Sequence, residues 1–255
     1  MDDRFDEVRN IISTMEKAVV CFSGGLDSTA LMHLCRETIG DDAVALYVSV
    51  PMESNRTLDM VDRISDNMGF KVTKRYMDDR ISGLVLQNRA DRCYICKKAI
   101  YSEAVELAYE LGIRHVICGD NADDDPDERP GMRASKELMV RSPFREAGIS
   151  RADIESYIHD LGLPFPMVKE TCLLMRIPVG IEADEELLDT IGDIESEIRQ
   201  ISGIEQVRAR LSNGVIRVQT SDKEIQSMID HGSEIDDICR RRGFGTELIR
   251  TGYKG

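Results

Sequence analysis

The chain has 255 residues, of which 42% are hydrophobic and 31% are charged, and its net charge at pH 7 is −14. This is an ordinary balance for a globular protein that is long enough to bury its own core. No run approaches the about 18 apolar residues of a membrane helix, and the polar start does not resemble a signal peptide, so we expect a cytoplasmic protein without a membrane partner. The acidic charge disfavours nucleic acid as a partner, because binding its backbone needs Lys and Arg against the phosphates.

The first 145 residues alternate strand-like and helical patterns. Strands are predicted at 17–22, 42–50, 70–77 and 114–120, with a weaker fifth at 138–144, and helices at 27–38, 55–68 and 97–111. The first, second and fourth strands are apolar enough to be buried on both faces, as strands of a parallel sheet are. The sequence therefore predicts an α/β fold with a doubly wound parallel sheet.

The pattern changes after residue 180. One apolar helical stripe is formed by Leu187, Ile191, Ile194, Ile198 and Ile201. Two strand-like runs, 204–211 and 214–220, are joined by a turn at 212–214, and a helix near 222–242 and a short strand near 246–250 follow. We therefore expect two domains, 1–180 and 181–255, the second being a small α+β domain for substrate binding or oligomerisation.

The most informative motif is Ser23-Gly24-Gly25-Leu26-Asp27-Ser28, which follows a predicted strand and precedes a predicted helix. The glycines let the backbone approach a ligand closely, and the helix N-terminus attracts phosphate. Ser23 and Ser28 add hydroxyl donors, and Asp27 is suited to hold Mg²⁺. No Walker lysine follows, so this is not the P-loop of nucleoside triphosphatases. The alternative is a purely structural one, in which the serines only cap the helix. The complete six-residue motif directly after a predicted buried strand makes this alternative less favoured.

A second polar segment, 119–124, follows the fourth predicted strand. Because the carboxyl ends of parallel strands share one edge of a sheet, we expect this segment to face the SGGLDS loop. Asp120, Asn121 and Asp124 are candidates for metal or nucleotide contact, and the other acidic residues nearby are expected to be solvated.

Three of the seven cysteines are candidates for chemistry. Cys93 and Cys96 lie three residues apart just before a predicted helix, a spacing that suits zinc, an iron–sulfur site or a redox pair. Cys172 lies in a segment predicted to be non-helical, where it is either a buried filler or a reactive thiol. Arg92, Lys97 and Arg176 are cations that would favour the thiolate. Cys21, Cys35 and Cys118 lie in apolar contexts and are expected in the core.

The SGGLDS motif resembles that of the PP-loop ATP pyrophosphatases, which cleave ATP between its α and β phosphates and adenylate a substrate. Over nearly its whole length the chain further resembles the LarE family of sulfur transferases. The matching features are SGGLDS, DRCYICK, GDNADD, VRSPF (140–144), LGLP (161–164) and Cys172-Leu173 followed by Arg176-Ile177-Pro178. The resemblance implies the PP-loop (HUP, adenine nucleotide α-hydrolase-like) fold, with ATP held by Ser23, Gly24, Gly25, Asp27 and Ser28.

The resemblance also implies a mechanism. A carboxylate of a pyridinium dicarboxylate mononucleotide attacks the α-phosphorus of ATP, pyrophosphate leaves, and sulfur displaces AMP to give a thiocarboxylate, a precursor of a nickel-pincer cofactor. The sulfur comes either from Cys172, which becomes dehydroalanine, or from a 4Fe–4S cluster held by Cys93, Cys96 and Cys172. We expect the cluster-dependent version, with zinc as the alternative metal. A homo-oligomer is also expected.

Further residues are candidates. By its chemistry alone, Arg176 would stabilise charge on the phosphorus or the acyl oxygen. Arg208 and Arg210 share one face of a predicted strand and match basic residues that the family uses around the substrate phosphate; the alternative is a solvated strand face. Glu195 and Glu197 either lie near that phosphate site or, as is more frequent, are helix carboxylates that face water. The chain departs from the family at residues 173–175, Leu-Leu-Met, where small residues are common. These larger side chains would narrow the space beside the sulfur, which leaves the substrate open.

Three other functions compete. A tRNA-thiolating enzyme uses the same adenylation, but the chain is acidic and shows no recognisable RNA-binding extension. An amide-forming enzyme similar to NAD or GMP synthetase would leave the three cysteines without a task. A regulator that binds nucleotide without turnover would not explain why both the loop and the cysteine set are complete.

Overall fold

The structure is a computed structural model that describes residues 4–125, 131–162 and 171–252. Its contacts divide the chain into two compact units. The first unit comprises Met1–Val50, Arg56–Val85 and Asp91–Pro166, and the second comprises Pro51–Asn55, Leu86–Ala90 and Met167–Gly255. Residues 171–180, which the sequence prediction groups with the first domain, thus pack with the second unit.

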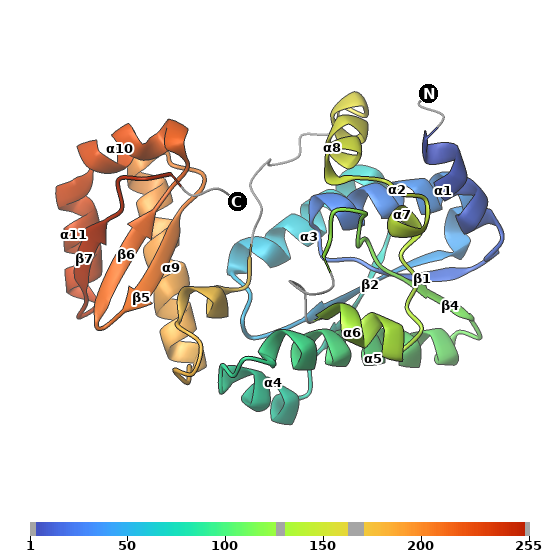
Figure 1. Cartoon of the computed structure of the whole chain (residues 1–255), viewed down its shortest axis with the longest axis horizontal. Helices are drawn as coiled ribbons and strands as arrows, with labels where there is room; N and C mark the ends of the chain where they lie inside the picture. Colours follow the sequence, from blue (N-terminus) through green and yellow to red (C-terminus); the bar gives the residue numbers. More distant parts are fainter. Residues whose placement is uncertain (1–3, 126–130, 163–170, 253–255) are drawn as a thin grey trace. The chain divides into compact units, whose positions relative to one another are not determined.

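A four-stranded parallel sheet forms the centre of the first unit (Figure 1). Its strands, in the order β3-β2-β1-β4, are β3 (Val72–Tyr76), β2 (Ala43–Ser49), β1 (Ala18–Cys21) and β4 (His115–Ile117). In register, Val20 lies between Ala45 and Ile117. The four main predicted strands are therefore confirmed, and so is their parallel arrangement.

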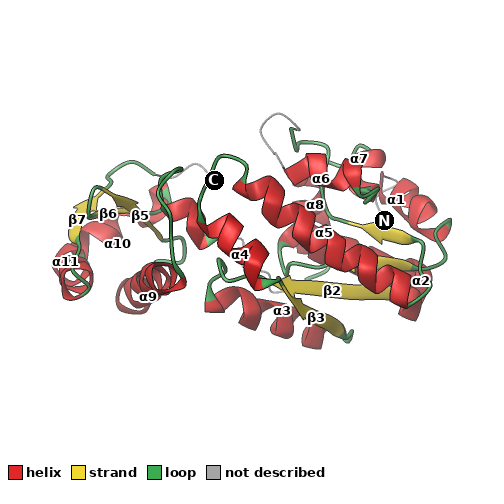
Figure 2. Ribbon diagram, turned by 90° about the horizontal axis from the view of Figure 1, so that it is seen from below, coloured by secondary structure: helices red, strands yellow, loops and turns green. Residues whose placement is uncertain are grey.

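Helices cover both faces of this sheet (Figures 1 and 2). One face packs against α1 (Arg4–Ser13), α2 (Leu26–Ile39), α3 (Asn55–Met68) and α8 (Arg151–Asp160), and the other against α5 (Arg92–Glu110) and α6 (Gly131–Glu137). Along β1, Ala18 and Val20 point to the first face and Val19 to the second, all fully buried. The sheet is doubly wound, as predicted. Two short helices, α4 (Asp79–Leu86) and α7 (Pro143–Glu146), and a 3₁₀ helix (Gly40–Asp42) also belong to this unit.

Two sequence predictions for this unit are wrong. The fifth strand, 138–144, is reduced to one parallel bridge between Arg141 and Ile117, because Pro143 lacks an N–H and begins α7 instead. Helix α5 begins at Arg92 rather than at residue 97. Cys93 and Cys96 therefore lie on the helix itself, and their spacing of three residues places them on one face.

The second unit is a small α+β structure, as predicted. Helix α9 (Glu185–Ser202) packs against a three-stranded sheet in the order β5-β6-β7, formed by β5 (Arg208–Ser212), β6 (Val215–Gln219) and β7 (Gly245–Leu248). Strands β5 and β6 are antiparallel, and the predicted turn between them has positive φ at Asn213 and Gly214. Helices α10 (Ile225–Asp230) and α11 (Gly232–Arg241) link β6 to the parallel strand β7.

Two details differ from the sequence prediction. The buried stripe of α9 uses Leu188 in place of Leu187, and Ile201 at its end is 40% exposed. The single helix predicted near 222–242 is broken at His231, and at Gly232, the first residue of α11, a Cβ would lie 3.2 Å from Leu248 of β7. Two short 3₁₀ helices, Leu173–Arg176 and Asp222–Glu224, also belong to this unit. Among the described helices, none is long and apolar enough to cross a membrane.

Candidate active site

The SGGLDS loop connects β1 to the N-terminus of α2. Gly24 has φ +69°, and a Cβ there would lie 3.0 Å from Val61 of α3, so both conformation and space favour glycine. The Ser23 and Ser28 hydroxyls lie 3.2 Å apart, and Ser28 donates to the carbonyl of Gly25 at 3.0 Å. This internally bonded turn precedes a 14-residue helix, whose free N–H groups and dipole attract an anion.

The segment after β4 packs directly against this loop. A Cβ on Gly119 would lie 3.0 Å from both the carbonyl carbon of Asp27 and the amide nitrogen of Ser28. Asn121 and Asp124 are buried, and Asp124 Oδ2 accepts a hydrogen bond from the Asn121 N–H at 3.0 Å. The expectation that the two segments meet at one edge of the sheet is confirmed, while the ligand contacts of these residues remain predictions.

Asp27 carries an unusual carboxylate. Its Oδ2 accepts a hydrogen bond from Arg151 Nη1 at 2.7 Å, whereas its Oδ1 is buried and accepts none from the described residues. Burial raises the pKa of Asp27, and the negative charge of Asp124 raises it further. The positive charge of Arg151 lowers the pKa, but not enough to bring it back to its usual value. A buried carboxylate oxygen without a donor suits a cation.

In the described part of the chain, no three Asp, Glu, Cys or His side chains gather into a ready-made metal site. Mg²⁺ usually takes one or two carboxylates together with substrate phosphates and water, so Asp27 and Asp124 fit such a shared site.

Lys97, on the second turn of α5, lies near Asp120 at the same edge of the sheet. Desolvation alone would lower the pKa of Lys97, but its neighbours, above all the Asp120 carboxylate, raise it overall, so the ammonium stays charged. A Cβ on Gly131 of α6 would lie 2.7 Å from the Lys97 side chain, so this glycine leaves room for the lysine.

Cys93 and Cys96 are half-buried at the start of α5, and neither is in a disulfide. Between them, the Tyr94 ring packs under the Arg133 guanidinium at 3.5 Å, and the Tyr94 hydroxyl donates to Glu137 at 2.7 Å. These contacts to α6 fix the first turn of α5, which carries both thiols. By contrast, burial raises the pKa of the Cys21, Cys35 and Cys118 thiols. Cys35 and Cys118 are buried in the core, as expected, whereas Cys21 is half-buried at its edge.

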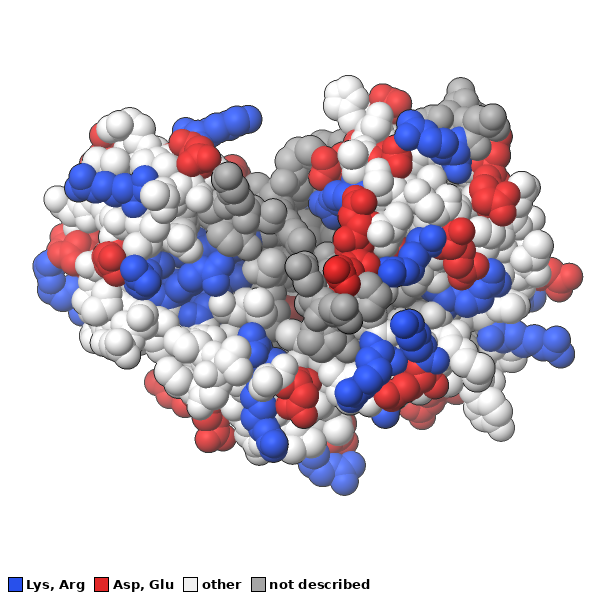
Figure 3. Space-filling view, in the orientation of Figure 1, with Lys and Arg blue, Asp and Glu red and all other residues white. Residues whose placement is uncertain are grey.

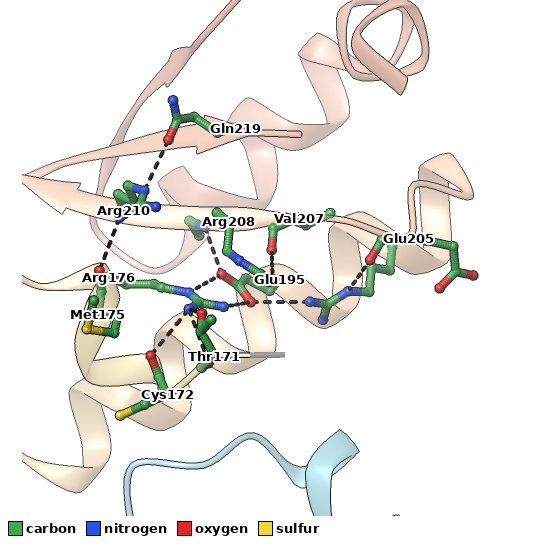
Figure 4. Close-up of polar contacts among 12 residues, drawn as sticks. Thr171, Cys172, Met175, Arg176, Glu195, Glu205, Val207, Arg208, Arg210 and Gln219 are labelled. Carbon is green, nitrogen blue, oxygen red and sulfur yellow. Dashed lines mark hydrogen bonds and ion pairs between the residues drawn. The ribbon is translucent and has the colours of Figure 1, made fainter. Parts of the chain in front are cut away.

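Cys172 belongs to the second unit, where it immediately precedes the 3₁₀ helix Leu173–Arg176. Figure 4 shows the Arg176 guanidinium pointing at Glu195, while the Cys172 sulfur points away from it. Arg176 Nε and Nη2 donate to Glu195 at 2.8 and 3.1 Å, and Nη1 donates to the Cys172 carbonyl at 3.3 Å. Both side chains of this ion pair are 1% exposed. The guanidinium thus stabilises the backbone at Cys172 through this hydrogen bond.

Glu195 is buried, so the expectation that it faces water is wrong. Its carboxylate also accepts hydrogen bonds from the Ala209 N–H at 2.9 Å and from Arg199 at 3.3 Å. Burial alone would raise the pKa of Glu195, but these partners and Arg176 lower it below its usual value, so the group stays ionised. Glu197 does lie at the surface, where it pairs with Arg241 and Arg242.

The two leucines that depart from the family pattern are buried. Leu173 and Leu174 are 2% and 1% exposed, whereas Met175 is 44% exposed. Leu173 packs against Gly192 of α9, where a Cβ would lie 3.3 Å from its Cδ1. Two of the three larger side chains thus fill the core of the second unit.

Arg208 and Arg210 lie on β5, above the Arg176–Glu195 pair in Figure 4. Arg208 is buried and donates to the Val207 carbonyl at 2.9 Å; Arg210 donates to Gln219 at 3.0 Å and to the Met175 carbonyl at 3.3 Å. Figure 3 shows Lys and Arg side chains gathered on this unit despite the negative charge of the chain. Substrate binding by the two arginines stays a prediction.

Sequence reasoning missed Arg151 and the buried role of Glu195. Arg151 and Asp27 are 124 residues apart in the sequence, and no sequence motif predicts their contact. Glu195 stands next to the apolar stripe of α9, and its position beside Ile191, Ile194 and Ile198 is a weak signal of burial.

Comparisons with known proteins agree with this geometry. The phosphoadenosine phosphosulfate reductase domain family matches residues 17–125, the part that contains the sheet and the SGGLDS loop. "Uncharacterized protein slr1717" of Synechocystis sp. is 29% identical over 100% of this chain and 95% of its own length. "Uncharacterized protein MJ0830" of Methanocaldococcus jannaschii is 29% identical over 90% and 87%. Pyridinium-3,5-bisthiocarboxylic acid mononucleotide synthase of Lactiplantibacillus plantarum is 24% identical over 91% and 85%.

The fold, the loop and these matches define an ATP-dependent enzyme of the PP-loop ATP pyrophosphatase superfamily. Its general chemistry is adenylation coupled to sulfur transfer. Within that superfamily, the chain resembles the LarE family of sulfur transferases over most of its length.

Proposed function

We propose that this enzyme adenylates a carboxylate of a pyridinium dicarboxylate mononucleotide and replaces one carboxylate oxygen with sulfur. The observation that carries the proposal is the packing of Gly119 against Asp27 and Ser28, which joins the anion-binding turn to the half-buried Asp27 carboxylate and the buried Asp124 carboxylate. The name of the Lactiplantibacillus relative, a thiocarboxylic acid mononucleotide synthase, supports the choice of acceptor.

In the first step, the turn at Ser23–Ser28 would bind the β and γ phosphates, and Asp27 with Asp124 would hold Mg²⁺, which neutralises their charge. The acceptor carboxylate attacks the α-phosphorus, and the bond to the β-phosphate oxygen breaks with departure of pyrophosphate. Lys97, which stays protonated beside Asp120, supplies a further positive charge at this edge of the sheet. The product is an acyl adenylate.

In the second step, sulfur attacks the acyl carbon and AMP leaves. Cys93, Cys96 and Cys172 would hold a 4Fe–4S cluster, which when bound would supply the transferred sulfur; zinc is the alternative occupant. If Cys172 is the donor instead, its thiolate forms a thioester, a proton leaves its Cα, and the Cβ–S bond breaks to leave dehydroalanine. Arg208 and Arg210 would bind the substrate phosphate, and the protein would work as a homo-oligomer.

The decisive experiment measures iron, acid-labile sulfide and the protein mass before and after turnover. The enzyme is purified without oxygen and given ATP, Mg²⁺ and the pyridinium mononucleotide, with Cys93→Ala, Cys96→Ala and Cys172→Ala in parallel and Cys239→Ala as control. About four irons per chain, lost in the three variants, with an unchanged protein mass after turnover, support the cluster.

The other outcomes separate the alternatives. Iron-free protein that loses the mass of H₂S from Cys172 on turnover identifies the cysteine donor. Pyrophosphate release and product formation that survive in all three variants would refute cysteine-dependent sulfur transfer.

A further inference from the structure

Two short pieces of chain, 51–55 and 86–90, leave the first unit and pack with the second. Both bond to the segment 171–183, here called the Cys172 segment. The Met52 carbonyl accepts from the Leu173 N–H at 2.8 Å, and the Leu86 carbonyl accepts from the Ala183 N–H at 2.9 Å. The Cys172 segment is thus held near both ends by these two pieces.

Asn88 lies at the centre of this arrangement and is fully buried. The side-chain Nδ2 of Asn88 donates to the carbonyls of Pro178 and Ile181, each at 2.8 Å. The backbone carbonyl of Asn88 accepts a hydrogen bond from the Gly180 N–H at 2.8 Å. Residues 177–181 belong to no helix or strand, so their carbonyls lack ladder partners. One side-chain amide therefore organises the turn that follows Cys172 and Arg176.

The residue type fits this task closely. Asn88 has φ +54°, a conformation that asparagine tolerates better than most residues. The amide supplies two donors, which a carboxylate lacks. Its Oδ1 is buried and accepts no hydrogen bond from the described residues, so the side chain acts through its donors.

We propose that Asn88 is a positioning residue for Cys172: by fixing the turn 177–181 it holds the 3₁₀ helix and the thiol before it in one orientation. The effect of Asn88 on catalysis rests on the proposed sulfur transfer, whereas its effect on the orientation of the Cys172 thiol does not. Asn88 precedes Cys93 by only five positions in the sequence, so one residue stabilises the Cys172 segment and lies on the chain that enters α5.

The test compares Asn88→Asp, Asn88→Ala and Asn88→Gly with the control Asn213→Gly in the full chain. Asn213 is an exposed asparagine of the same unit with φ +51°, so it matches the backbone conformation without the buried amide. The first readout is the iodoacetamide alkylation rate of Cys172 relative to Cys93, followed by peptide mass spectrometry. We expect about a fivefold or larger rise in the Asn88 variants, the effect of losing roughly one net hydrogen bond, and no change in the control.

The second readout separates adenylation from sulfur transfer. We expect acceptor-dependent pyrophosphate release to change less than about twofold, while thiocarboxylate formation falls about tenfold. If Asn88→Asp fails to fold, judged by circular dichroism, Asn88→Gly keeps the positive φ and still removes the donors. An unchanged alkylation rate in a folded Asn88 variant, or an equal rise in Asn213→Gly, overturns the proposal. A wild-type enzyme that transfers no sulfur refutes the proposed function, but leaves the alkylation result to decide on Asn88.

Discussion

Replacing Glu195 with glutamine should destabilise the protein far more than its position on a helix suggests. The carboxylate is 1% exposed and accepts hydrogen bonds from Arg176, Arg199 and the Ala209 N–H. Glutamine would turn one acceptor into a donor that faces the guanidinium and would leave the Arg176 charge buried without its counter-ion. Removing one member of a buried ion pair costs about 3–5 kcal/mol, so we expect a loss of this size in the free energy of unfolding.

The assay is urea unfolding followed by circular dichroism, with Glu197→Gln as the control. Glu197 lies two positions further along the same helix and pairs with Arg241 and Arg242 at the surface, where such a pair contributes about 0–1 kcal/mol. Because the folded pKa of Glu195 is lowered, its stabilisation is fully present above the unfolded pKa of about 4.3 and is lost as pH falls through the folded pKa. The difference between wild type and Glu195→Gln should therefore stay constant from pH 7 to 5.5. Equal losses for Glu195→Gln and Glu197→Gln at pH 7 would refute this reasoning.

Three further predictions concern the first unit. Gly119→Ala should lower ATP-dependent pyrophosphate release about tenfold or more, because the added Cβ would displace the loop at Asp27. Gly83→Ala, which has open space around the added Cβ, should leave this release unchanged, and equal activities of the two variants would contradict the packing argument. Arg151→Ala removes a charge that lowers the pKa of Asp27, so the pKa of Asp27 should rise further. Pyrophosphate release should then fall more at pH 6 than at pH 8, and an equal fall at both pH values would show that Arg151 does not act through the charge of Asp27. Burial raises the pKa of Cys35 to about 12, which leaves about one thiolate in ten thousand at pH 8, so iodoacetamide should modify Cys93 first, as peptide mass spectrometry would show.

The sheet of the first unit could be predicted because its signals are local. The apolar runs at β1, β2 and β4 each mark a strand buried on both faces. The fifth strand failed because the residues around Arg141 have strand-like composition, while Pro143 and the positive φ of Met139 end the pairing after one bridge. The early start of α5 was missed because the one buried residue in its first two turns is Arg92, and the buried apolar stripe begins only at Tyr101.

Side-chain partners at the site were harder to predict than the elements. The encounter of Gly119 with the SGGLDS loop follows from parallel topology, which brings strand ends to one edge. The Arg151–Asp27 contact depends on the placement of α8, which no local pattern specifies. Likewise, Asn88 lies between the apolar run 84–86 and the charged stretch 89–92 and resembles an ordinary turn residue, although it is fully buried.

The spacing of Cys172 and Arg176 illustrates how a motif can have a structural cause. A 3₁₀ helix has about three residues per turn, so Leu173 and Arg176 fall on the same side, and both are buried while Met175 between them is exposed. Arg176 can then donate back to the Cys172 carbonyl and forward to Glu195. A lysine at 176 could form at most a part of this set, because its single ammonium cannot match the two-pronged contact with the carboxylate. The arginine four residues after the cysteine is thus explained by backbone support for the sulfur-bearing residue, even before any charge on a substrate is considered.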